Sequence, residues 1–241
     1  MSDKYSVILL SAGAGNRMNS DIPKQYMDLK GKMILRYSLE TFERDERIGE
    51  IVIVANEAWI DTVKENIVKQ YGYTKVTDVV VGGKERYESV YKGLCALKDT
   101  DYVMIHDGAR PFVDHEMIAR LAEAVRTHKA CIPAVKSKDT IRLSDDKGFV
   151  TMTPDRNNVW NIQTPQTFEY VKLKSAFDDY MSNTAEYGQV TDDAMVWELV
   201  TGGSVKIVEG SYNNIKITTP EDISVGEGIV NKMSKSEMCD N

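Results

Sequence analysis

The chain has 241 residues, of which 42% are hydrophobic and 28% are charged, and its formal net charge at pH 7 is −7. This length and apolar content suffice for one well-buried α/β domain. The acidic balance excludes general nucleic-acid binding, which needs a basic surface, although a few local Lys and Arg side chains can still hold a small anion.

Cysteine usage and hydropathy indicate a cytoplasmic protein. The three cysteines, Cys95, Cys131 and Cys239, are far apart and odd in number, so neither a disulfide framework nor a metal site is expected. No run approaches the roughly 18 apolar residues that span a membrane. The apolar stretch near the N-terminus is too short for a signal peptide. We therefore expect neither secretion nor membrane association.

Short apolar runs alternate with helical patterns through the first half of the chain. Strands are predicted at residues 7–10, 51–55, 76–81, 102–105 and 131–135, because these runs are short and rich in β-branched residues. Helices are predicted between them, at residues 34–42, 59–71, 86–97 and 117–125. This alternation implies parallel strands with helices on both faces of the sheet, and a ligand outside the carboxyl ends of the strands.

Residues 136–159 are polar and only weakly periodic. Runs 140–143 and 149–152 flank residues 144–148, where Asp145, Asp146 and Gly148 favour a turn, so a β-hairpin is predicted. A hairpin with so little apolar content needs something to pack against. We interpret residues 136–159 as an arm that contacts a second subunit; the alternative is a mobile surface hairpin.

The remaining chain completes the predicted domain. Helices are predicted at 170–181 and 192–200, a strand at 205–208, an extended segment at 214–218, and a last helix that Pro220 and Glu221 open. Residues 233–241 are polar and are predicted to be a flexible tail. We therefore expect one domain, residues 1–232, with a three-layer α/β/α fold, a mostly parallel Rossmann-like nucleotide-binding sheet and an inserted β-hairpin arm.

The most informative segment, SAGAGNRM at residues 11–18, follows the first predicted strand and precedes Pro23-Lys24-Gln25. Its small residues let backbone N–H groups approach phosphate oxygens, and Arg17 and Lys24 add two cations. The segment matches neither the GxxxxGK[ST] loop nor the GxGxxG fingerprint. A plain tight turn is the alternative for such a glycine-rich stretch. The added Arg and Lys favour a cradle for a nucleoside triphosphate.

Four further segments carry polar motifs. They are residues 82–89 (GGKERYES), 106–111 (HDGARP), 155–166 (DRNNVWNIQTPQ) and 214–218 (NIKIT). Three of them follow a predicted strand or precede a predicted helix, where a parallel sheet presents its ligand. Together with the first loop, they indicate a single site assembled from distant parts of the chain.

These motifs closely resemble those of the 2-C-methyl-D-erythritol 4-phosphate cytidylyltransferases, which belong to the sugar-alcohol phosphate cytidylyltransferases, and the resemblance covers about residues 7–229. It implies transfer of CMP from CTP to 2-C-methyl-D-erythritol 4-phosphate in non-mevalonate isoprenoid biosynthesis, with release of pyrophosphate. It also implies Mg²⁺ bridging the CTP phosphates, no protein metal ligands, and a homodimer in which each arm reaches the other active site.

The resemblance also implies the site residues. Those along CTP are Ser11, Ala12, Gly13, Ala14, Gly15, Gly83, Lys84, Ser89, Asp107 and Gly108. Those around the sugar-alcohol phosphate are Arg110, Thr140, Arg156, Thr164, Thr191 and Lys216, with Arg156 supplied by the neighbouring arm. The catalytic cations are Arg17, Lys24, Arg156 and Lys216. Lys84 stands where the family often has Asp, so only a backbone contact is expected there.

Several of these residues have a simpler structural interpretation. Arg110 and Arg156 could form ordinary salt bridges, and Asp107 could cap the turn after its strand. Thr191 and Asp192 could cap the following helix. His106 is expected to be structural, because a phosphate nucleophile is already ionised and needs no general base.

Two other functions compete with this interpretation. A ribitol-5-phosphate cytidylyltransferase of teichoic-acid synthesis would use the same loop and the same chemistry. A catalytically inactive nucleotide-binding module would keep the loop alone. The second pair of cations, Arg156 and Lys216, argues against the inactive module, because a protein that only binds a nucleotide does not need it.

Replacing Lys24 or Arg17 with Ala is expected to lower turnover by roughly two to three orders of magnitude, a typical cost of losing one donor to the transition state. Each cation would stabilise charge that develops on the α-phosphate and on the departing pyrophosphate. The measurement is kcat from pyrophosphate release by each purified variant. Turnover near the wild-type value would reject the role of the residue replaced.

Overall fold

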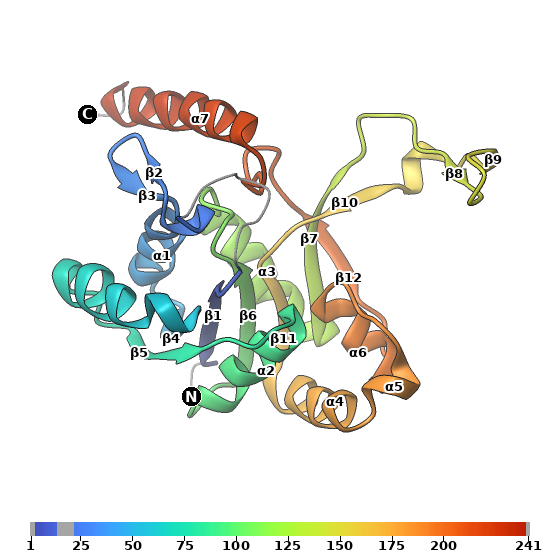
Figure 1. The fold of residues 1–241 in the computed structure, drawn as a ribbon, viewed down its shortest axis with the longest axis horizontal. Coiled ribbons are helices and arrows are strands. Elements are labelled where there is room, and N and C mark those ends of the chain that lie inside the picture. The colour runs from blue at the N-terminus through green and yellow to red at the C-terminus, as the bar shows by residue number, and fades with distance from the viewer. Residues whose placement is uncertain (1–2, 14–21, 240–241) are drawn as a thin grey trace.

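The computed structural model describes residues 3–13 and 22–239, which form a central sheet flanked by helices (Figure 1). The strand order is β10-β7-β11-β6-β1-β4-β5, and β12 also pairs with β7. The strands are β1 Tyr5–Ser11, β4 Ile48–Ala55, β5 Val76–Val81, β6 Tyr102–Asp107, β7 Ala130–Lys136, β10 Trp160–Ile162, β11 Gln166–Glu169 and β12 Lys206–Glu209. All pairs are parallel except those of β10 and β11, so the predicted mostly parallel sheet is confirmed.

Helices cover both faces of the sheet, as predicted. One layer contains α1 Ile34–Arg44, the π-helix Thr62–Lys69 and α3 His115–His128, and the other contains α2 Arg86–Ala96, α4 Tyr170–Ser182 and α6 Asp193–Thr201. Because successive side chains of a strand point to opposite faces, Val7 and Leu9 of β1 pack in the first layer and Ile8 packs in the second. Among the described residues, no helix is both long and apolar enough to cross a bilayer.

Four details differ from the sequence prediction. The strands β10 and β11 were not predicted, and neither were the short elements β2 Asp28–Leu29, β3 Lys32–Met33 and α5 Thr184–Tyr187. Residues 214–218 lie outside the sheet, although the N–H of Ile217 donates to the carbonyl of Ala109 (2.9 Å). Helix α7, Pro220–Cys239, extends through most of the segment that was expected to be a tail.

The predicted hairpin is present at the tip of a projecting arm (Figure 1). It pairs β8, Leu143–Ser144, with β9, Val150–Met152, so the first strand is shorter and later than the predicted 140–143. The turn forms because the Asp145 carboxylate accepts hydrogen bonds from the N–H groups of Lys147 (3.0 Å) and Phe149 (2.9 Å). Four apolar side chains of the hairpin, Leu143, Phe149, Val150 and Met152, are 48% to 70% exposed.

Candidate active site at the carboxyl edge of the sheet

The predicted motifs meet where the parallel strands end. β1 and β6 are neighbours, and Leu10 is aligned with Asp107. A Cβ atom at Gly82 would lie 2.4 Å from the Cβ of Ala12, so the segment after β5 contacts the loop after β1. The Nζ of Lys216 lies 2.7 Å from Oδ2 of Asp107. Segments far apart in sequence therefore lie together at the carboxyl edge of the sheet.

Gln25 anchors the start of the first loop. Its Nε2 donates hydrogen bonds to the carbonyls of Ser11 (2.6 Å) and Gly13 (2.9 Å), and its side chain is buried. The hydroxyl of Ser11 donates to the carbonyl of Val54 (3.1 Å). These bonds bring the half-buried Lys24, next to Gln25, to the loop. Gln25 was not among the predicted site residues, although it belongs to the quoted Pro-Lys-Gln motif.

Three residues predicted for the first loop, Ala14, Gly15 and Arg17, lie outside the described residues. Gly13 lies at the end of the described part and is exposed, with open space where a side chain would project. That space would let a ligand approach the backbone closely, which is the role that the sequence analysis gave to the glycines of this loop.

The segment after β5 is ordered by its own side chains. The hydroxyl of the buried Ser89 accepts a hydrogen bond from the N–H of Gly83 (3.0 Å). The Glu88 carboxylate accepts from the N–H groups of Lys84 (2.6 Å) and Glu85 (3.0 Å), which completes a capping box at the start of α2. The N–H of Lys84 is thus already hydrogen-bonded within the protein. Only the carbonyl of Lys84 would then be left for the expected backbone contact with CTP.

Asp107, at the end of β6, is the centre of an ion-pair network. Its Oδ2 contacts Nζ of Lys216, and its Oδ1 lies 3.4 Å from Nε of Arg86. The two terminal nitrogens of Arg86 donate to the two carboxylate oxygens of Asp193, each at 2.8 Å. Burial alone would raise the pKa of Asp107, but the charges of Arg86 and Lys216 outweigh burial and hold this pKa well below its usual range. Asp107 is therefore ionised.

Gln166 and Asp192 hold Asp193 in place. The Oε1 of Gln166 accepts from the N–H groups of Asp193 and Ala194, both at 3.0 Å, and its Nε2 donates to Asp192 (2.8 Å). Asp192 caps α6 by accepting from the N–H of Met195 (3.0 Å), so the expected cap is confirmed. The neighbouring Thr191 is exposed.

The Arg86–Asp193 pair could not be predicted from the sequence, because these residues are 107 positions apart. Arg86 does lie within the quoted motif at 82–89, and Gln166 ends the quoted motif at 155–166. No local pattern links either of them to Asp193.

His106 has a structural role, as expected. The carbonyl of Arg110 can only accept, so Nε2 of His106 carries the proton and donates to it (2.9 Å). Nδ1 then accepts from the hydroxyl of Thr164 (3.1 Å), whose oxygen accepts from the N–H of Asp107 (3.1 Å). Burial lowers the pKa of His106 to about 4, so the ring is neutral at pH 7. The hydroxyl of Thr164 is thus committed within the protein.

Arg110 is held by backbone carbonyls. Its terminal nitrogens donate to the carbonyls of Asn214 (2.8 Å) and Ile162 (3.3 Å), and among the described residues its buried Nε has no hydrogen-bond partner. Within residues 3–13 and 22–239 no carboxylate forms a salt bridge with it, so the salt-bridge interpretation of Arg110 finds no support there. Burial lowers the pKa of Arg110, because a desolvated cation is disfavoured. An anion at this site would compensate for that cost.

Comparison with known proteins identifies the family. Residues 5–232 match the family model described as IspD: 2-C-methyl-D-erythritol 4-phosphate cytidylyltransferase. The chain belongs to this family. The enzyme of that name from Lachnoclostridium phytofermentans is 49% identical over 230 residues, which cover 95% of this chain and 97% of the relative. The Clostridioides difficile enzyme is 44% identical, with 97% of both chains covered.

Solved structures of the IspD family share the fold. The 4-diphosphocytidyl-2C-methyl-D-erythritol synthase from Anaerococcus prevotii superposes with a TM-score of 0.83 at 35% identity, covering 95% of this chain and 99% of that one. The Francisella tularensis enzyme gives a TM-score of 0.75, also at 35% identity, covering 93% and 98%. Similarity along both full chains confirms the three-layer α/β/α fold.

Two residues that the family resemblance assigns to the sugar-alcohol phosphate lie on the arm. Thr140 and Arg156 are both exposed, and Arg156 begins the 3-10 turn Arg156–Asn158. Within the described part of the chain, neither side chain forms a hydrogen bond or an ion pair. Figure 1 shows the arm, with β8 and β9 at its tip, projecting from the sheet. Within the described residues, no hydrogen bond or ion pair joins Thr140 or Arg156 to Asp107 or Lys216.

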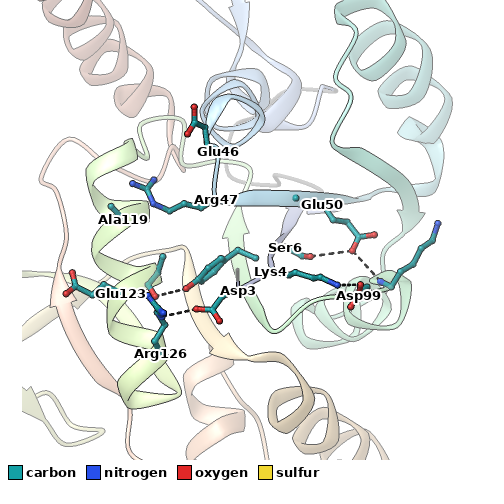
Figure 2. A pocket seen from close by; sticks show the side chains of 14 residues that line it. Asp3, Lys4, Ser6, Glu46, Arg47, Glu50, Asp99, Ala119, Glu123 and Arg126 are labelled. Atoms are coloured by element: carbon teal, nitrogen blue, oxygen red, sulfur yellow. Dashed lines mark hydrogen bonds and ion pairs between the residues drawn. The ribbon is translucent and has the colours of Figure 1, made fainter. Parts of the chain in front are cut away.

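A cavity of about 960 Å³ lies at the other end of the sheet (Figure 2). It is lined by Ser6 of β1, Glu50 of β4 and Arg126 of α3, among other residues. Ion pairs occupy several of its charged groups, including Arg126 with Asp3 at 2.8 Å. Because it lies at the amino ends of the strands, it is separate from the candidate active site at their carboxyl ends.

A magnesium ion at the carboxyl edge would have to be held mainly by substrate. Among the described residues, no three His, Cys, Asp or Glu side chains converge as a metal site. The carboxylate at the edge, Asp107, is shared between Arg86 and Lys216. Magnesium commonly binds one or two carboxylates together with the phosphates of a substrate, so phosphates would supply most of its ligands here.

The depressed pKa of His106 should make stability pH-dependent. The unfolded chain has a His pKa near 6.5, above the folded value of about 4, so the unfolded state takes up the proton first. The contribution of His106 to the free energy of unfolding is fully present above about pH 6.5. The free energy of unfolding should fall by roughly 3 kcal/mol as the pH drops to 4, with about 2 kcal/mol lost by pH 5. Urea unfolding of wild type and His106→Gln at several pH values measures this. Equal pH dependence in both proteins would contradict the assignment.

Proposed function

We propose that this protein transfers CMP from CTP to 2-C-methyl-D-erythritol 4-phosphate, giving 4-diphosphocytidyl-2-C-methyl-D-erythritol and pyrophosphate. The observation that carries this proposal is that the motifs of its family, which extend from Ser11 to Lys216, meet at the carboxyl edge of β1 and β6. The membership of nearly the whole chain in the cytidylyltransferase family supports the same reaction.

The reaction is attack by one phosphate on another. A phosphate oxygen of the methylerythritol phosphate forms a bond to the α-phosphorus of CTP, the bond from that phosphorus to the β-bridging oxygen breaks, and pyrophosphate leaves. The nucleophile is already ionised, so the neutral His106 has no proton to remove. The barrier comes from bringing two anions together and from charge that develops on the phosphates, so fixed cations and N–H donors lower it.

Four cations supply this stabilisation in our proposal. Lys24 and Arg17 act on the triphosphate, with backbone N–H groups of the first loop beside them. Lys216, held by Asp107 at 2.7 Å, acts on the reacting phosphate, and Arg110 contributes its positive charge to the second substrate. Mg²⁺ bound to the CTP phosphates would neutralise part of their negative charge.

The proposed site is completed by a second copy of the chain. The exposed apolar side chains of the arm, such as Phe149 at 70% and Val150 at 58%, support a protein interface there. Arg156 and Thr140, exposed on the same arm, would then reach the sugar-alcohol phosphate of the partner. A homodimer built in this way would hold two equivalent active sites. We also place the enzyme in the cytoplasm, which the free thiols of Cys95 and Cys131 support.

Purified protein with CTP and Mg²⁺ should release pyrophosphate when 2-C-methyl-D-erythritol 4-phosphate is added. Ribitol 5-phosphate at the same concentration is the matched control, because it has the same charge and similar size. We expect product with the first substrate only. Pyrophosphate release with ribitol phosphate alone would assign the enzyme to teichoic-acid synthesis, and no release with either would reject catalysis.

Arg156→Ala should raise the KM for the sugar-alcohol phosphate, and Lys216→Ala should lower kcat. If each site combines Arg156 of one subunit with Lys216 of the other, mixing the two variants gives heterodimers with one intact site each. Random exchange should then restore roughly a quarter of the wild-type sites. The measurement is activity after mixing, beside each variant alone. No recovery in a mixture that demonstrably exchanges subunits would place both residues in the same chain's site.

A further inference from the structure

Arg86 is a charged residue of the site to which the family resemblance assigned no role. It lies at the start of α2, and its side chain is 29% exposed. One guanidinium group contacts two carboxylates: both oxygens of Asp193 at 2.8 Å, and Oδ1 of Asp107 at 3.4 Å. Arg86 therefore connects α6 with the end of β6.

Asp193 fixes the direction of this guanidinium. The Asp193 side chain is 1% exposed, and the residue's own N–H donates to the buried side chain of Gln166. A fork-to-fork contact restrains both the position and the plane of the guanidinium. The remaining nitrogen, Nε, then faces Asp107, so the position of Arg86 at Asp107 is set by α6.

Asp107 is divided between two cations. Its Oδ1 faces Arg86 and its Oδ2 faces Lys216 at 2.7 Å, and no other described cation forms a salt bridge with it. Two cations at one carboxylate repel each other, so each is held less strongly there than it would be alone. Without Arg86, both oxygens of Asp107 would be left to Lys216.

We propose that Arg86, anchored by Asp193, is a positioning residue: it shares the Asp107 carboxylate and so keeps the Lys216 ammonium available to the reacting phosphate. This inference rests on the proposed cytidylyl transfer. A purely structural Arg86 would tie α2 to α6 through Asp193 and have no effect on turnover beyond its effect on stability. The two roles can be separated by restoring stability without restoring the charge.

The test compares Arg86→Gln with the double variant Arg86→Gln/Asp193→Asn. The single variant leaves a buried carboxylate unpaired, whereas the double variant removes both charges of the pair and should fold. The matched controls are Arg47→Gln and Arg47→Gln/Asp45→Asn. Arg47 binds both oxygens of Asp45 (2.9 and 2.8 Å), which is also 1% exposed, and it lines the cavity at the opposite end of the sheet.

We expect Arg86→Gln to lower kcat about ten- to hundredfold, the range seen when groups that orient functional side chains are lost at metal sites. The KM for CTP should change little. The double variant should recover melting temperature but not kcat, whereas both Arg47 controls should keep wild-type kcat. Recovery of kcat together with stability in the double variant would overturn the proposal, as would equal losses in the Arg86 and Arg47 variants.

A measurement without turnover separates this proposal from the proposed function. Carboxyl ¹³C NMR follows the titration of Asp107, assigned through Asp107→Asn. Loss of a cation within ion-pair distance should raise the pKa of Asp107 in Arg86→Gln, so that its titration begins at a higher pH than in wild type, and the Arg47 controls should leave it unchanged. An unchanged titration would reject the sharing of Asp107. If the wild-type protein released no pyrophosphate, the proposed function would fail while this titration still decided the role of Arg86 at Asp107.

Discussion

Asp107 is a largely buried carboxylate at the end of β6, and such a group persists only when cations or hydrogen-bond donors offset its lost hydration. Lys216 and Arg86 supply the positive charge. The hydroxyl oxygen of Thr164 accepts a hydrogen bond from the backbone N–H of Asp107 and so fixes the backbone there. These partners come from segments that begin after β5, before β11 and before α7. Because these three segments all contact Asp107, the pairing of its largely buried charge fixes their positions relative to one another.

The site is locally cationic although the chain carries a net charge of −7. Asp193 neutralises Arg86, and Lys216 is held by a carboxylate that it shares, while Arg110 donates to two backbone carbonyls. The local field, not the net charge, decides which ligand binds. Two anionic substrates can therefore meet at one edge of an acidic protein, where the remaining positive charge of these side chains reduces their repulsion.

The arm and the segment that carries Lys216 share a base. Gln163, which follows β10, donates to the carbonyls of Ser211 (2.8 Å) and Asn214 (3.3 Å). The hydroxyl of Tyr212 donates to the carbonyl of Lys136 at the end of β7 (2.9 Å). The strands that support the arm are thus bonded to the loop that positions Lys216. A partner that fixes the arm would also restrain one side of the active site.

The sequence by itself determined the alternation of strands and helices, as β5 shows with its predicted bounds of Val76–Val81, because apolar periodicity is a local property. The sequence also determined that glycines and small residues stand close to Arg and Lys after the first strand, a combination suited to phosphate groups. Only the tertiary structure decided that the short polar runs β10 and β11 become strands, since their pairing depends on β6 and β7. It alone placed Arg86 against Asp193, because attraction between charges depends on distance in space, not on separation along the chain.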